Sequence, residues 1–237
     1  MNMSRVAPTA RADDPAVAAY MRMIFNYMTG GVALSGAVAF LTMKSEGLMQ
    51  AAMNPTTQII FMVIWLGSGF VMNGLINRLQ PAAALGLFAF FSAITGFAFT
   101  PLVAAYTSAS VFLAFFTAAG MFAGASAYGY VTGKSLSGWG NFLMMGVMGL
   151  LVAVVIQIVG SLMGYQMGGF SFIISLLAVP LFAGLTAYET NMLRDMYYSH
   201  AGDDVTTSRR AIYGAYSLYV NFVIMFIHLL QLLGDRR

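Results

Sequence analysis

A single carboxylate near the end of an apolar stretch is the first group in this sequence that could do chemistry. Glu189 is the only acidic residue between positions 170 and 190. An ionisable residue inside lipid is costly, so it is a functional candidate by default. The alternative is that Glu189 reaches the interface, since Asn191 and Arg194 follow within about two turns. We favour a functional role for Glu189.

Three polar side chains interrupt the last apolar stretch at helical spacing. Asn221 lies four residues after Ser217 and seven before His228. These intervals place all three along one face of a helix. A polar stripe on so apolar a segment indicates a face turned to protein or water. For His228 an interfacial position near the helix end is more usual than proton sensing.

One basic residue, Arg78, follows the second apolar stretch directly. Arginine at such a position is commonly a topology anchor, and a functional role is the alternative.

The elements that carry these residues are membrane spans. Of 237 residues, 59% are hydrophobic and 8% are charged, against about 25% charged in soluble chains. We therefore expect an all-α integral membrane protein in a lipid bilayer, with stretches near the ~20 residues that cross it. The seven expected spans are 23–43, 58–77, 83–105, 108–131, 141–163, 170–190 and 211–233.

The basic residues predict how these spans are oriented. With the amino terminus in the cytoplasm, eight of them fall inside and three, Lys44, Arg236 and Arg237, fall outside. Because lysine and arginine are retained in the cytoplasm, this orientation is favoured. Residues 1–21 form an expected polar cytoplasmic tail, followed by a seven-span domain over 22–237. A last segment that dips into the membrane without crossing is the alternative.

Small residues and prolines predict how the spans pack. Glycines four apart, such as Gly120 with Gly124, let helix backbones approach closely, and packing inside the bundle is favoured over a dimer motif. Pro101 and Pro180 lie within expected spans and should bend them.

Several other classes of function are excluded or disfavoured. The chain has no cysteine, so it has no disulfide and no thiolate chemistry. No basic stretch suits nucleic acid. Both lysines, Lys44 and Lys134, lie in expected loops, which excludes a retinal-type Schiff base. The segment from Gly129 to Ser135 is one residue short of a phosphate loop. We expect neither an enzyme nor a resident cofactor, and a metal site is left open.

Two longer motifs resemble a known family. Phe182-Ala-Gly-Leu-Thr-Ala-Tyr-Glu-Thr190 and Ala215-Tyr-Ser-Leu-Tyr-Val-Asn-Phe222 are similar to signatures of the Bax inhibitor-1 family, in particular its bacterial branch. Supporting pieces are Thr95-Gly96 through Pro101, and Gly129 through Gly140. The resemblance runs from the first expected span onward.

This resemblance implies a seven-helix bundle with the last helix at its centre, in a bacterial inner membrane. It also implies a calcium leak gated by protons through two facing aspartates. Glu189 falls on the first aspartate position and Asn221 on the second, so one carboxylate faces an amide. Two acids sharing a proton titrate as a coupled pair, and an amide cannot. Arg78 is the nearest candidate for the family's basic latch.

Two hypotheses follow. The first is a channel or leak pathway for calcium, held only transiently, or for another cation, lined by Glu189 and Asn221. The second is a non-conducting regulator that binds a membrane AAA protease or other membrane proteins.

Overall fold

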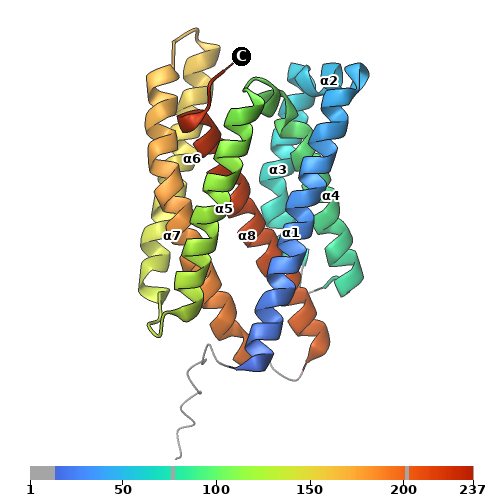
Figure 1. Cartoon of the computed structure of the whole chain (residues 1–237), viewed down its shortest axis with the longest axis vertical. Helices are drawn as coiled ribbons and strands as arrows, with labels where there is room; N and C mark the ends of the chain where they lie inside the picture. The colour runs from blue at the N-terminus through green and yellow to red at the C-terminus, as the bar shows by residue number, and fades with distance from the viewer. Residues whose placement is uncertain (1–13, 76–77, 201–202, 237) are drawn as a thin grey trace, which may run out of the picture.

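Helices form most of the described part of the chain, in a computed structural model that describes residues 14–75, 78–200 and 203–236. Seven of its helices are long and apolar enough to cross a membrane. A short helix and a 3-10 turn complete the path (Figure 1). In chain order the elements are α1 (Pro15–Lys44), α2 (Glu46–Met53), α3 (Pro55–Leu75), α4 (Pro81–Ala104), α5 (Ser108–Val131), η1 (Ser137–Trp139), α6 (Gly140–Leu162), α7 (Gly168–His200) and α8 (Asp204–Leu233).

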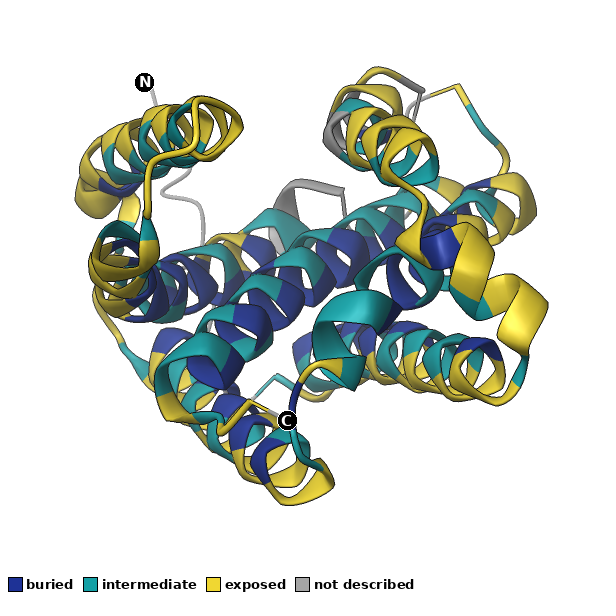
Figure 2. Ribbon diagram, turned by 90° about the horizontal axis from the view of Figure 1, so that it is seen from above, coloured by how far each residue is buried: buried dark blue, intermediate teal, exposed yellow. Residues whose placement is uncertain are grey.

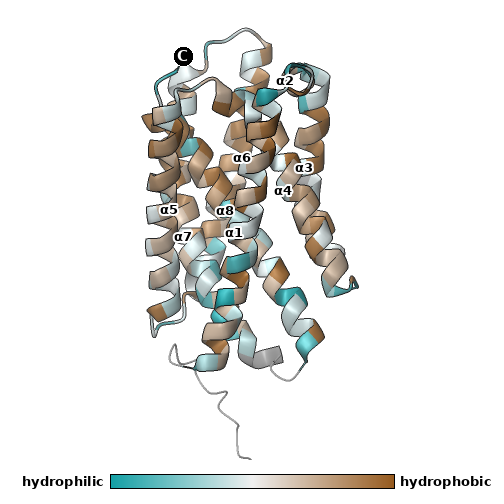
Figure 3. Ribbon diagram, turned by 45° about the vertical axis from the view of Figure 1, so that its right-hand side comes forward, coloured by the Kyte–Doolittle hydropathy of each residue, from teal (hydrophilic) through white to brown (hydrophobic). Residues whose placement is uncertain are grey.

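The outside of the bundle is apolar. Large side chains such as Phe70, Phe116 and Leu162 are 84%, 69% and 83% exposed, which a water-soluble fold would not sustain over such an area. Figure 2 shows exposed positions on the outward faces of the helices and buried positions on the faces that meet other helices. In Figure 3 apolar residues cover most of the helix lengths, and polar ones gather toward the end where α7 meets α8. The exposed faces therefore contact lipid.

The last helix has the most buried apolar window, 56% against 44% for α7 and 6% for α6. It packs against α7, α5, α1 and α4. Its hydroxyls bond to other helices: Tyr219 lies 2.6 Å from the Ser35 hydroxyl on α1, and Tyr216 lies 3.0 Å from Ser68 on α3. Such interhelical hydrogen bonds hold helices together where lipid gives no hydrophobic drive.

The last segment runs the length of the bundle, as the expected span at 211–233 predicted, and does not dip in as the alternative had it. At about 1.5 Å per residue, the 30 residues of α8 are roughly 45 Å long. Its far end meets the turn between α4 and α5, where Tyr106 and Arg236 form an isolated bridge. There the Thr107 amide donates to the Asp235 carbonyl at 3.1 Å. The segment after α8 therefore lies at the same end as α2 and this turn (Figure 1).

Two expected loops are largely helical. The separator at 44–57 contains α2, because Ser45 caps its first turn and Pro55 starts the next helix. The separator at 191–210 is shortened to the gap between α7 and α8. Asp203 caps α8 by accepting hydrogen bonds from the Val205 and Thr206 amides, both at 3.1 Å. Hydropathy marks the part of a helix that faces lipid, and these helices continue beyond it.

The first helix begins before the expected span at 23–43. Helix α1 begins at Pro15, with Asp14 as its cap, so residues 15–21 of the expected tail are helical. The rest of that tail, residues 1–13, lies outside the described residues.

The glycines that bring helices together are not the ones expected from spacing. A Cβ at Gly120 or Gly124 would meet nothing within 4 Å. A Cβ at Gly96 would clash with the Ser35 carbonyl oxygen, and a Cβ at Gly129 would clash with the Ala187 carbonyl oxygen. These two glycines set the α1–α4 and α5–α7 contacts. Pro101 and Pro180 do lie inside helices, as predicted.

Candidate functional site

The polar residues singled out in the sequence meet at the interface of α7 and α8. The Asn221 amide donates to Glu189 Oε2 at 2.8 Å, and the Ser217 side chain bonds to the same carboxylate. Asn221 is buried and Glu189 is partly buried. One carboxylate is thus held by two neutral groups from the facing helix, an arrangement that lets it stay in an apolar bundle with its oxygens bonded.

His228 belongs to a second polar cluster on the same interface. Its Nδ1 lies 3.0 Å from the hydroxyl of Ser175, and that hydroxyl donates to Gln231 Oε1 at 2.8 Å. Ser175 and Gln231 were not singled out in the sequence. A signal was present: Ser175 precedes Glu189 by 14 residues, and Ser217 precedes Gln231 by 14. That interval is about four helical turns, so each pair shares a face.

Arg78 is not brought to this site. It is exposed in the turn after α3, whereas Glu189 faces α8. Its role as a latch stays a prediction.

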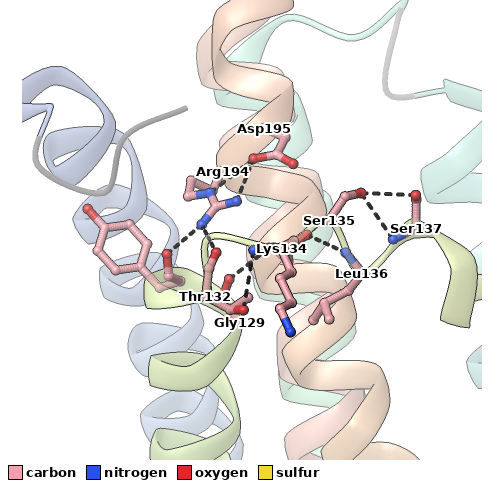
Figure 4. Close-up of polar contacts among 10 residues, drawn as sticks. Gly129, Thr132, Lys134, Ser135, Leu136, Ser137, Arg194 and Asp195 are labelled. Atoms are coloured by element: carbon pink, nitrogen blue, oxygen red, sulfur yellow. Dashed lines mark hydrogen bonds and ion pairs between the residues drawn. The ribbon is translucent and has the colours of Figure 1, made fainter. Parts of the chain in front are cut away.

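The end of α7 holds the loop between α5 and α6, as Figure 4 shows. Asn191 is 2% exposed, accepts from the Leu136 amide at 3.1 Å and donates to the carbonyls of Gly129 and Lys134. Arg194 is 5% exposed and donates to the carbonyls of Tyr130 and Thr132 at 2.7 and 2.8 Å.

Arg194 is paired with the carboxylate beside it. Its Nε and Nη2 donate to Asp195 Oδ1 at 3.0 and 2.8 Å, while Nη1 reaches the loop. The segment from Gly129 to Ser135 therefore presents carbonyls to α7, and does not cradle a phosphate. Sequence inspection treated Asn191 and Arg194 as interfacial residues and missed this role.

No group of three or more histidine and acidic side chains in the described ranges could hold a metal ion. Around the Glu189 carboxylate, the oxygens of Glu189, Asn221 and Ser217 are available to a cation. Calcium takes six to eight oxygens, so an ion here would keep much of its water.

Comparisons with known proteins identify the family. A family model described as inhibitor of apoptosis-promoting Bax1 matches residues 17–237. The chain belongs to the Bax inhibitor-1 family. The resemblance noted in the two helical motifs is thereby confirmed, and both motifs lie at the α7–α8 interface just described.

Similar proteins occur in diverse bacteria. An uncharacterized protein of Deinococcus radiodurans is 37% identical over 237 residues, covering 99% of this chain and 98% of its own length. An uncharacterized protein of Caulobacter vibrioides is 32% identical over 250 residues, covering 99% and 96%. The inner membrane protein YbhL of Escherichia coli K12 is 31% identical over 220 residues, covering 92% of each chain.

Proposed function

We propose that this protein is a channel or leak pathway for calcium or another cation, with Glu189 and Asn221 lining the cytoplasmic half of the path. The observation that carries the proposal is the Glu189 carboxylate, held at 2.8 Å by Asn221 between two helices of an apolar bundle. Acidic groups at such positions commonly mark ion pathways. The family resemblance points to the same pair of positions.

The proposed path needs no catalytic residue and no resident cofactor. Glu189 supplies negative charge, and the oxygens of Asn221 and Ser217 replace part of the ion's hydration. Calcium would bind only transiently, because a single carboxylate offers it little charge.

The proposed location is a bacterial inner membrane, as for the relative named above, with the amino terminus in the cytoplasm. The excess of basic residues on the end that carries Arg22 and Lys134 supports this orientation.

The test is calcium flux into dye-loaded liposomes containing the purified protein, from about pH 5 to about pH 8. Glu189→Gln removes the charge while keeping an acceptor for Asn221, so flux should fall about tenfold. Glu46→Gln is the matched control, since Glu46 is an exposed carboxylate at the other end of the bundle, and it should leave flux unchanged.

Asn221→Asp adds the second acid of the family's pair. A single carboxylate titrates in one step, whereas two facing acids titrate as a coupled pair. Flux should therefore vary more steeply with pH in this variant than in the wild type. Absence of flux above empty liposomes in all variants would sink the proposal.

A non-conducting regulator of a membrane AAA protease or of other membrane proteins is the second candidate. It is favoured by the neutral residue at position 221, which leaves one carboxylate where the family has two acids. Deleting residues 2–13, which precede α1, separates the candidates: a leak pathway keeps its flux, while a regulator engaged through this tail loses its handling by the protease.

A further inference from the structure

An apolar cavity of about 310 Å³ lies between α1, α4, α5 and α8. It is separate from the Glu189 site. On α1 its lining runs from Val32 to Met43, about 16 Å at the helical rise. That length is close to one leaflet of a hydrocarbon core about 30 Å thick.

The cavity opens sideways into the membrane. Among its lining residues, Phe40 and Met43 on α1 and Phe115 on α5 are exposed, at 57%, 43% and 36%. Helix α1 packs on α4 and α8, and α5 packs on α7 and α8, so α8 forms the back wall. In Figure 1, α1 and α5 stand on either side of α8.

The polar groups at the floor of the cavity are already hydrogen-bonded within the protein and need no water. The Ser35 hydroxyl is 2.6 Å from the Tyr219 hydroxyl and 2.8 Å from the Ser92 carbonyl. The Thr95 hydroxyl donates to the Phe91 carbonyl at 2.8 Å. Water in a cavity needs two to four polar partners, and the remaining lining is aliphatic and aromatic.

A lysine side chain lies beside the cavity lining at the end of α1. Lys44 follows Met43 at the end of α1, and its Nζ lies 5.5 Å from the centre of the Phe40 ring. Other charged groups described at this end are Glu46, Asp235 and Arg236. Lys44 thus contacts a residue that lines the cavity.

We propose that this cavity binds an acyl chain of a membrane phospholipid, whose phosphate lies against Lys44. A laterally open apolar cavity one leaflet deep matches the chain, and the ammonium at its surface end matches the phosphate. This lipid site between α1 and α5 is independent of ion conduction.

The test is native mass spectrometry of the detergent-purified full chain titrated with palmitoyl-oleoyl phosphatidylglycerol. Gly36 lines the cavity, and a Cβ there meets nothing within 4 Å. Gly36→Leu therefore fills the cavity without displacing the helices, and bound lipid should fall about fivefold or more.

Gly30→Leu is the matched control. Gly30 is on the same helix with equally open space, so lipid binding should be unchanged in this variant. Ala39→Leu is a second filling variant.

Lys44→Gln should lower lipid binding about fivefold, as expected for one lysine at a phosphate, while Lys134→Gln at the opposite end should not. Glycerophosphoglycerol, which has the headgroup without chains, should not bind. The proposal is overturned if Gly36→Leu and Gly30→Leu bind lipid equally. It is also overturned if Gly36→Leu instead dissociates a dimer, because a second copy would then be the occupant.

Discussion

At the scale of single residues, hydrogen bonds from neighbouring helices, loops and caps hold the buried or capping charged side chains in position. Glu189 is bonded by Asn221 and Ser217, and Arg194 by backbone carbonyls. The facing of positions 189 and 221 was expected from the family resemblance. The roles of Asn191 and Arg194 in holding the α5–α6 loop were not, since their partners in that loop are backbone carbonyls and amides, which leave no trace in residue type.

Asp203 gives a pH-dependent prediction outside the membrane spans. Hydrogen bonds from the Thr206 side chain and amide, and from the Val205 amide, hold the pKa of its carboxyl below the ordinary value. A lowered pKa means that the cap stabilises α8 above the ordinary carboxyl pKa of about 3.9, and that this stability is lost as the pH falls through the lowered pKa.

We therefore expect the amides of Thr206 and Thr207 to exchange hydrogen faster as the pH drops below about 4, beyond the intrinsic pH effect on exchange. In Asp203→Asn, an uncharged cap remains and the extra acid sensitivity should disappear. Equal acid sensitivity in both proteins, measured by hydrogen exchange mass spectrometry, would contradict this role for Asp203.

At the scale of helices, contact is decided by which glycines face a neighbour, and spacing does not reveal this. Gly129 is packed on the Ala187 carbonyl, while Gly120, nine residues earlier on the same helix, meets open space. The sequence predicted where seven apolar spans run, because lipid demands long apolar stretches. It did not predict the polar extensions of α7 and α8, whose helicity depends on caps and on packing.

Gly129→Ala should destabilise the bundle by about 1–3 kcal/mol, because the added methyl group must displace the α7 backbone. Gly120→Ala should cause no loss of stability, since alanine is a better helix former than glycine. Thermal unfolding of both variants in the same detergent compares them directly. Similar melting temperatures for the two would show that the α5–α7 contact tolerates an added methyl group.

At the scale of the whole molecule, seven crossings place the two ends of the described chain on opposite faces. Gln50 in α2 and the segment after α8 share one face, and Ser135 lies at the other. The count of spans and the alternation of loops followed from hydropathy alone. The contact between Arg236 and Tyr106, which joins residues far apart in the sequence, could not be predicted from hydropathy.

The absence of cysteine makes this topology easy to test. In intact spheroplasts, Gln50→Cys should react with a membrane-impermeant maleimide, and Ser135→Cys should react only after lysis. A cysteine at Arg236 should behave like the one at position 50. Labelling of the variants at 50 and 236 from opposite sides would rule out the crossing of α8.

The position of α8 also constrains biogenesis. The ribosome makes α8 after the six other spans. Yet the hydroxyl of Tyr219 in α8 is hydrogen-bonded to the hydroxyl of Ser35 in α1, the first span. Contacts between α1 and α4 and between α5 and α7 can form while synthesis continues, whereas the contacts of α1, α5 and α7 with α8 form only after α8 is made. The nascent bundle therefore stays incomplete in the bilayer, with the Glu189 carboxylate lacking its partners on α8, until its final span is inserted.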